Sequence, residues 1–217
     1  MLDKHVLELD GFPYPFAVSK FEFTSQNQNL QMAYMDVGPK KSSEVAVLLH
    51  GKNFSGFYLK NVADLLTKVG YRVIVPDQIG FGKSTKLQSY QYRFSQFLLN
   101  TSKLLSSLKI GKATIIGHSM GGMLATDFAY HFSQMKRKLI LINPIGLEYY
   151  GKYAKVKDIN FFYNNEKNKT VEKARNYQKK NYYDGKWNDT YEALLASLKL
   201  QIGTKEWDRI VWNNALH

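Results

Sequence analysis

Four short segments that are apolar at every position except Arg72 and Thr114 constrain the fold of this chain more than any other feature. They lie at residues 45–49, 71–75, 113–116 and 139–142. Continuous apolar runs of this length are typical of strands that are covered on both faces. The stretches between them are long enough for helices, and alternating strands and helices form parallel sheets with right-handed crossovers. The sequence therefore predicts an α/β fold, with a mostly parallel sheet and helices on both faces.

The segments around these runs complete the expected core. Helices are expected between the strands, at residues 58–69, 92–108 and 121–131. Near the N-terminus, apolar and polar residues alternate over residues 16–23 and 30–37, with a polar turn between the two segments. Such alternation is typical of half-buried strands. We therefore expect residues 1–36 to be β-structure and to form an antiparallel hairpin.

The sequence changes character after Pro144. Residues 150–217 are rich in lysine, asparagine and tyrosine, and they contain no apolar run of the buried-strand type. This part is therefore not expected to continue the sheet. We divide the chain into the N-terminal part of a core, residues 1–145, and a helical cap or lid, residues 146–217.

Two helices are predicted within the cap. They cover residues 170–183 and 190–202, with a turn at Asp184 and Gly185 between them. Each range begins with a threonine, Thr170 or Thr190. Threonine is a good N-cap residue because its hydroxyl accepts a hydrogen bond from a backbone N–H of the first turn.

A G-x-S-x-G turn lies between the third apolar run and the helix expected after it, with Ser119 at its centre. A strand that reverses sharply into a helix forces this serine into a strained conformation and leaves room only for glycine at Gly117 and Gly121. The turn lifts the serine hydroxyl out of the fold. It also directs the Met120 backbone N–H toward an oxyanion formed there. Ser119 is therefore predicted to be a nucleophile for an acyl-type substrate.

At this point the chain resembles a known family, the α/β-hydrolase fold. The resemblance covers nearly the whole chain. Within the family, the chain is most similar to the branch of esterases, epoxide-hydrolase-like enzymes and C–C hydrolases that carry a helical cap. The residues that carry it are His50 and Gly51, the stretch Asp77-x-x-Gly80-x-Gly82-x-Ser84, the elbow at residues 117–122, and Asn143 with Pro144.

The resemblance implies roles for three residues. Ser119 would be the nucleophile, and the backbone N–H groups of Met120 and Lys52 would form the oxyanion hole. A serine at the elbow argues against epoxide hydrolases and haloalkane dehalogenases, which use a carboxylate there.

A serine nucleophile also needs a histidine base that a carboxylate orients. In this family the acid and then the histidine follow the serine along the chain, each after a further strand. No histidine of this chain has that context, and each is expected to have a structural or surface role. The five are His5, His50, His118, His131 and His217.

The candidate acids are equally sparse. Asp77 is in a position that the family uses to brace loops, whereas Glu148, after the fourth apolar run, lies where some relatives place an alternative acid. We therefore hypothesise that the chain is the front part of a longer enzyme and lacks the last two strands of the fold. Residues 139–142 would then form a bare sheet edge, which favours self-association.

Composition excludes several other classes of protein. The net charge is +12 and the sequence pI is about 9.6, but the lysines are spread along the chain, so we expect no nucleic-acid partner. The chain has no cysteine and no H-E-x-x-H spacing, so neither a disulfide nor a metal site is predicted. The hydrolase interpretation needs no cofactor.

No segment of 18 apolar residues is present, so no membrane span is expected. The residues after Met1 lack the apolar segment of a signal peptide. The chain as written is therefore predicted to be cytoplasmic. A signal peptide preceding Met1 would instead make it periplasmic or secreted.

The sequence thus predicts a serine hydrolase that cleaves an ester or related acyl bond through an acyl-enzyme. No residue chooses among ester, C–C, peptide and peroxy chemistry. Cap aromatics suggest a small apolar acyl substrate, although they could equally serve only to pack the helices: Phe161, Phe162, Tyr163, Trp187, Trp207 and Trp212. The alternative is a catalytically inactive remnant or interaction module of the same fold.

Overall fold

The computed structural model describes residues 3–52, 54–152, 155 and 157–215. Within them, one six-stranded sheet has the order β1-β2-β4-β3-β5-β6. Strands β3 to β6 are parallel, whereas β1 pairs antiparallel with β2, and β2 pairs antiparallel with β4. The mostly parallel sheet and the N-terminal hairpin are confirmed. The strands are β1 (Val18–Ser25), β2 (Gln28–Val37), β3 (Val45–Leu49), β4 (Arg72–Pro76), β5 (Ala113–His118) and β6 (Lys136–Ile142).

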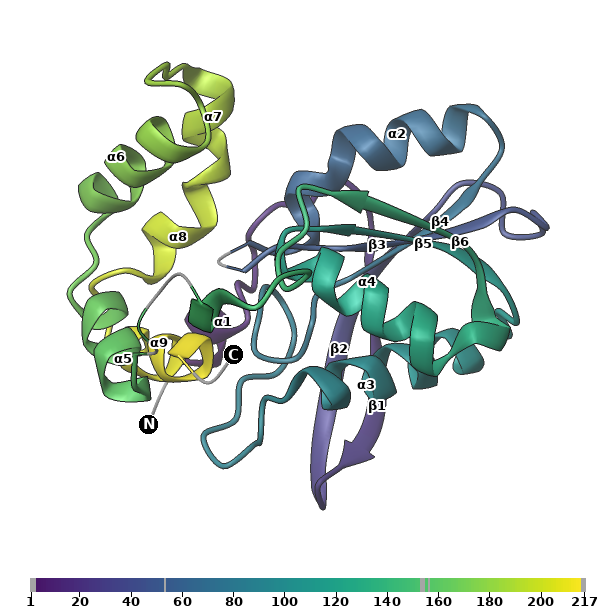
Figure 1. Ribbon diagram of the computed structural model, residues 1–217, viewed down its shortest axis with the longest axis horizontal. Coiled ribbons are helices and arrows are strands. Elements are labelled where there is room, and N and C mark those ends of the chain that lie inside the picture. Colours follow the sequence, from purple (N-terminus) through teal and green to yellow (C-terminus); the bar gives the residue numbers. More distant parts are fainter. Residues whose placement is uncertain (1–2, 53, 153–154, 156, 216–217) are drawn as a thin grey trace.

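Helices cover both faces of the sheet, as expected. Helix α2 (Lys60–Lys68) lies on one face, and α3 (Phe94–Ser107) and α4 (Met120–His131) lie on the other (Figure 1). Side chains along β3 alternate between two buried clusters: Val47 packs with residues of α3 and α4, and its neighbour Ala46 packs with residues of α2. This burial on both faces explains why β3 is apolar at every position.

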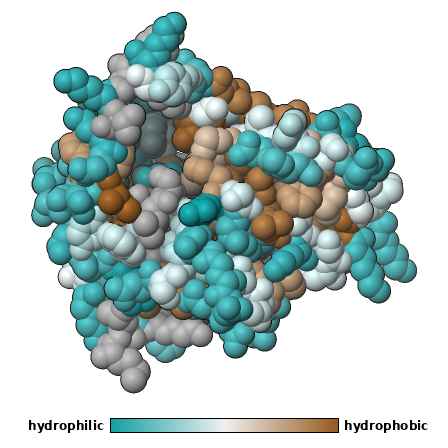
Figure 2. All heavy atoms as spheres, turned by 60° about the horizontal axis from the view of Figure 1, so that its bottom comes forward, coloured by the Kyte–Doolittle hydropathy of each residue, from teal (hydrophilic) through white to brown (hydrophobic). Residues whose placement is uncertain are grey.

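Strand β6 is the edge of the sheet within the described residues, where it pairs with β5. Three of its apolar side chains are exposed: Leu139 by 37%, Ile140 by 43% and Ile142 by 37%. Hydrophobic side chains are visible on the surface of the half of the molecule that holds the sheet (Figure 2). The apolar run at residues 139–142 therefore forms an edge strand whose side chains are incompletely covered.

Helices follow β6 and lie together on one side of the sheet-containing part (Figure 1). Thr170 caps α6 as predicted, because its hydroxyl accepts from the Lys173 N–H. The cap prediction at Thr190 is wrong: Asn188 caps the helix that begins at Asp189, and its side chain accepts from the Tyr191 N–H. The helix expected at residues 190–202 is also divided in two. The elements are α5 (Ile159–Lys167), α6 (Val171–Asn181), α7 (Asp189–Leu194), α8 (Ala196–Gln201) and α9 (Trp207–Ala215).

The N-terminal segment corrects another expectation. It contains a short helix, α1 (Lys4–Leu7), where β-structure was expected. The Asp3 N–H donates to Glu206 Oε1 at 2.7 Å, and Gln201 Nε2 donates to the Val6 carbonyl at 3.1 Å. Contacts with α8 and with the residue before α9, which are 195 and 203 positions away in sequence, thus hold this segment in a helical turn.

Candidate active site

Ser119 lies at a sharp turn between β5 and α4. Its φ is 54° and its ψ is −119°, a strained conformation for a residue with a side chain. A Cβ on Gly117 would lie 2.0 Å from the carbonyl oxygen of Gly121, and a Cβ on Gly121 would lie 2.1 Å from the carbonyl oxygen of Leu49. Residues 117 and 121 must therefore both be glycine, because the atoms that a Cβ would meet belong to the backbone and cannot rotate away.

Backbone hydrogen bonds fix this turn to the end of β6. The Ser119 N–H donates to the Ile142 carbonyl at 3.1 Å, and the Ser119 carbonyl accepts from Ile145 N–H at 3.2 Å. The serine is partly exposed, and its hydroxyl has no hydrogen-bond partner among the described residues. The turn thus presents an accessible hydroxyl at the carboxyl end of a parallel sheet, where ligands bind in open α/β folds.

The loop after β3 lies directly against the serine. A Cβ on Gly51 would come within 3.3 Å of Ser119 Cβ. For the part of the chain that the structure describes, the backbone N–H groups of Lys52 and Met120 have no acceptor. Met120 is the first residue of α4, where the helix dipole places partial positive charge. These two donors are therefore available to an oxyanion at Ser119.

Tyr58 joins this loop to the elbow, a role that the sequence did not indicate. Its hydroxyl accepts from the Gly51 N–H at 3.0 Å and lies 2.7 Å from His118 Nδ1. Burial raises the pKa of Tyr58 and lowers the pKa of His118. Both groups therefore favour the neutral state, in which they hydrogen-bond to each other beside Ser119.

His50 is fully buried and holds the same loop from the other side. Its Nδ1–H donates to the Gly51 carbonyl at 2.9 Å, and its Nε2 accepts from the Gln78 N–H at 3.0 Å. Burial lowers its pKa, in agreement with a neutral ring that uses one nitrogen as donor and the other as acceptor. Both ring nitrogens are occupied, so His50 is not free to act as a base.

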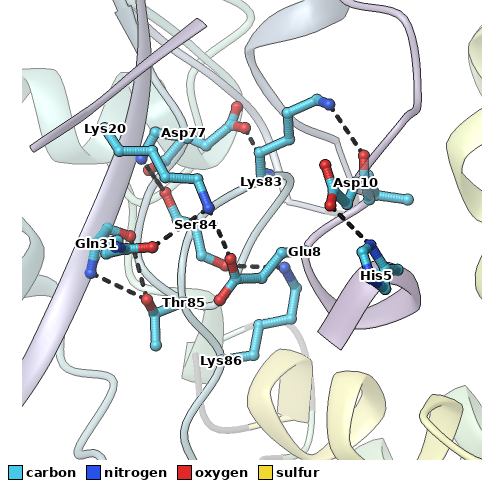
Figure 3. Close-up of polar contacts among 12 residues, drawn as sticks. His5, Glu8, Asp10, Lys20, Gln31, Asp77, Lys83, Ser84, Thr85 and Lys86 are labelled. Atoms are coloured by element: carbon cyan, nitrogen blue, oxygen red, sulfur yellow. Dashed lines mark hydrogen bonds and ion pairs between the residues drawn. The ribbon is translucent and has the colours of Figure 1, made fainter. Parts of the chain in front are cut away.

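Asp77 connects three loops. Its Oδ1 accepts from the Gly56 N–H at 2.6 Å, and its Oδ2 accepts from the Tyr14 hydroxyl at 2.6 Å and from the Lys83 N–H at 2.8 Å. The Ser84 hydroxyl donates to its carbonyl at 2.7 Å (Figure 3). Asp77 is 1% exposed, and these contacts make it a brace for the loops around the site.

The other candidate residues lie elsewhere. His5 pairs with Asp10 at 2.7 Å on the surface, and His131 is exposed at the end of α4. His217 lies outside the described residues. Glu148 is exposed on the loop after β6, without a hydrogen bond or ion pair among those residues. Within the described ranges, no imidazole bonds to the Ser119 hydroxyl.

Most of the aromatic side chains singled out in residues 146–217 pack the helices of that region. Trp207 is buried with Ile210 and Val211, and Tyr163 packs edge-on against Trp212 at 5.7 Å between ring centres. Trp187 packs in the same way against Tyr183. Phe161 and Phe162 are 43% and 44% exposed, whereas the other members of the set are partly or fully buried.

Two further properties bear on the class of protein. The described residues contain no group of three or more His, Cys, Asp or Glu side chains that could bind a metal ion. No helix in these ranges has both the length and the apolar character needed to cross a membrane.

Comparisons with known proteins place this geometry in context. A family model described as the alpha/beta hydrolase fold matches residues 47–206. A 2-hydroxy-6-oxo-6-phenylhexa-2,4-dienoate hydrolase from Burkholderia cepacia is 32% identical over 124 residues, which are 55% of this chain and 42% of the relative. A cis-3-alkyl-4-alkyloxetan-2-one decarboxylase from Xanthomonas campestris is 35% identical over 120 residues, 51% of this chain and 39% of the relative. The matches thus span about two fifths of these relatives.

Solved structures show the same similarity over more of the chain. The crystal structure of a probable hydrolytic enzyme from Pseudomonas aeruginosa has 40% sequence identity and a TM-score of 0.90, covering 96% of this chain and 68% of that one. A haloalkane dehalogenase from Paraglaciecola agarilytica shares the fold, with 18% identity and a TM-score of 0.71. That match covers 95% of this chain and 67% of the dehalogenase chain.

Proposed function

The chain belongs to the alpha/beta hydrolase fold family, and from this premise we propose that it is a serine hydrolase whose nucleophile is Ser119. The strained, positive φ of Ser119 between two obligatory glycines carries the proposal. A hydroxyl held in this way can approach a carbonyl carbon, because the two flanking glycines have no side chains that would block the approach. The reaction class that fits is hydrolysis of an ester or related acyl bond.

In the proposed reaction, Ser119 Oγ bonds to the carbonyl carbon and gives up its proton to a base. The negative charge on the carbonyl oxygen is stabilised by the N–H groups of Lys52 and Met120. The ester C–O bond then breaks, and the leaving alcohol takes the proton from the base. Water attacks the acyl-enzyme in the same way and regenerates Ser119.

The base of this reaction is a separate part of the proposal. The described histidines that lie near Ser119 are His50, whose ring nitrogens are both occupied, and His118, which bonds to Tyr58. We therefore propose that a histidine and its carboxylate come from a further segment of the protein that packs beside β6. Glu148 as an alternative acid stays a prediction.

Residues 146–217 are proposed to be a cap over the site. Two contacts between this region and the loop after β3 support the assignment. Lys52 Nζ lies 5.9 Å from the centre of the Phe162 ring, and the rings of Phe54 and Tyr182 are 6.4 Å apart. The cap helices therefore meet the loop that also supplies an oxyanion donor.

The exposed apolar edge of β6 favours a second candidate, a non-catalytic interaction module. Hydrolysis of p-nitrophenyl butyrate separates the two. For the protein with the further segment that supplies the base, the proposal predicts hydrolysis above the buffer rate. Ser119→Ala should abolish this hydrolysis, and Ser133→Ala, a substitution at an exposed serine, should leave it unchanged. Equal hydrolysis by folded unaltered protein and Ser119→Ala would favour the interaction module.

A further inference from the structure

We propose that the side chain of Lys52 and the cavity beside it bind an anionic group of the substrate, such as a carboxylate. The inference rests on the proposed function, because it names the substrate class for the same site. It also differs from the apolar acyl substrate expected from the sequence. The proposed substrates are esters or related acyl compounds that carry a carboxylate several bonds from the reacting carbonyl.

A cavity of about 380 Å³ lies between Phe54 and the helices α5, α6 and α8. The ring of Phe54 also packs 4.8 Å from the ring of Tyr58, which hydrogen-bonds to His118 beside Ser119. The wall combines aromatic and aliphatic surface with charged and amide groups. It includes Phe54, Ala174, Tyr177, Tyr182 and Leu198, together with Asn165, Glu166, Lys169, Lys173 and Gln178.

Lys52 is the strongest sign of an anionic ligand. Its side chain is partly buried and reaches toward α5, where the ammonium group lies 5.9 Å from the Phe162 ring centre. The ammonium has no hydrogen bond or ion pair among the described residues. Burial lowers the pKa of Lys52, and the attraction of Glu166 offsets this effect only in part, so the charged form has lost solvation that its surroundings do not fully replace. A ligand anion would supply the missing partner.

The protein's own carboxylate near Lys52 is already engaged. Glu166 forms an ion pair with Lys169 one helical turn away. Glu166 is the one carboxylate among the residues that line the cavity, whereas Lys169 and Lys173 are both basic. Lys52 lies close enough to Glu166 and Lys169 of this wall to interact with both electrostatically. The cavity and its surroundings therefore have an excess of positive charge.

Gln178 adds a polar contact point that nothing in the described protein satisfies. The residue is 7% exposed, and its Oε1 has no hydrogen-bond partner. A buried carbonyl oxygen without a donor costs free energy, so a ligand N–H or O–H that donates to Oε1 would be favoured over an alkyl chain. Gln178 therefore favours a hydrogen-bond donor on the ligand, such as an amide N–H, whereas the anionic group is assigned to Lys52.

Lys52 would then act twice on one substrate. Its backbone N–H faces the oxyanion at Ser119, and its ammonium holds the carboxylate at a distance along the substrate. The ammonium group would position the reacting carbonyl by binding the remote carboxylate, and it would take no part in breaking the acyl bond.

The test is equilibrium binding measured by calorimetry with an unreactive probe, the monoanilide of hexanedioic acid, and with its neutral primary amide, which carries no ester. A charge-assisted hydrogen bond corresponds to about tenfold or more in affinity, so we expect the acid to bind at least about tenfold more tightly. Lys52→Met should remove this preference. Lys103→Met is the matched control, because Lys103 also lies over a phenylalanine ring, at 5.7 Å from Phe23 on another part of the molecule.

Ser119→Ala should keep the preference for the acid, because the probe does not react. A preference that persists in Ser119→Ala while Ser119 fails to react with esters would support the anion site and reject the proposed function. The inference is overturned by equal affinities for acid and neutral amide, by no binding of the acid to the unaltered protein, or by a preference that survives in Lys52→Met.

Discussion

The carbonyl oxygen of Leu49 lies 2.1 Å from the place that a Cβ on Gly121 would occupy. The end of β3 and the first turn of α4 are thus in direct backbone contact. This contact brings the loop after β3, with the Lys52 N–H, up to the residue that follows Ser119. The close approach of two backbones, rather than a side-chain interaction, determines the shape of the proposed oxyanion site.

Gly121→Ala should therefore disrupt the fold around Ser119. The added methyl group meets backbone atoms that cannot rotate away, so we expect a loss of about 3 kcal/mol in the free energy of unfolding, at the upper end for overpacking. Gly111→Ala is the control, since a Cβ there meets nothing within 4 Å. Urea denaturation measures both. Equal stability of the two variants would contradict the close contact.

Removal of the Tyr14 hydroxyl should weaken the brace at Asp77. Tyr14 donates to Asp77 Oδ2 at 2.6 Å, and hydrogen bonds to charged groups contribute about 1.5–3 kcal/mol. Tyr14→Phe should lower the free energy of unfolding by that amount, whereas Tyr130→Phe, at a residue that is 80% exposed, should change it by less than about 0.5 kcal/mol. If urea denaturation gives the same free energy of unfolding for Tyr14→Phe and the unaltered protein, the brace does not depend on the Tyr14 hydroxyl.

Local sequence patterns predicted the strands and the elbow because each depends on residues that are close in sequence. Buried strands need continuous apolar runs, and the turn at Ser119 needs glycine at Gly117 and Gly121. Helix α1 was missed because its contacts are with Gln201 and Glu206. The hydrogen bond from Gly51 to Tyr58 and the packing of Lys52 near Phe162 were missed for a related reason. These contacts depend on the final packing of loops and helices, which no local pattern records.

His50 should make the stability depend on pH. Burial lowers its pKa in the folded state below the ordinary value of 6.5, so the unfolded chain binds the extra proton first as the pH falls. The stabilisation is fully present above about pH 6.5 and is lost below it, at up to about 1.4 kcal/mol per pH unit.

The measurement is urea denaturation at about pH 7.5 and about pH 5.5. The difference in unfolding free energy between the two pH values should be smaller in His50→Asn than in the unaltered protein. His131→Asn, at an exposed residue, should leave it unchanged. An equal difference in all three proteins would contradict a buried, neutral His50.

Where the further segment proposed to pack beside it is absent, the edge of β6 should promote self-association. Ile140 is 43% exposed on this strand, and a lysine at a sheet edge opposes pairing with another chain. We expect sedimentation velocity to show dimers or larger species that Ile140→Lys reduces. Leu65→Lys is the control, since Leu65 is 65% exposed on α2. A monomeric unaltered protein would show that this edge does not pair.

Covalent labelling with a fluorophosphonate, mapped by mass spectrometry, tests the role of Ser119 most directly. The account predicts one label per chain, on the peptide that contains Ser119, with no label in Ser119→Ala and none after denaturation of the unaltered protein. Folded protein that stays unlabelled, or a label of equal extent in Ser119→Ala, would contradict the assignment of Ser119 as the nucleophile.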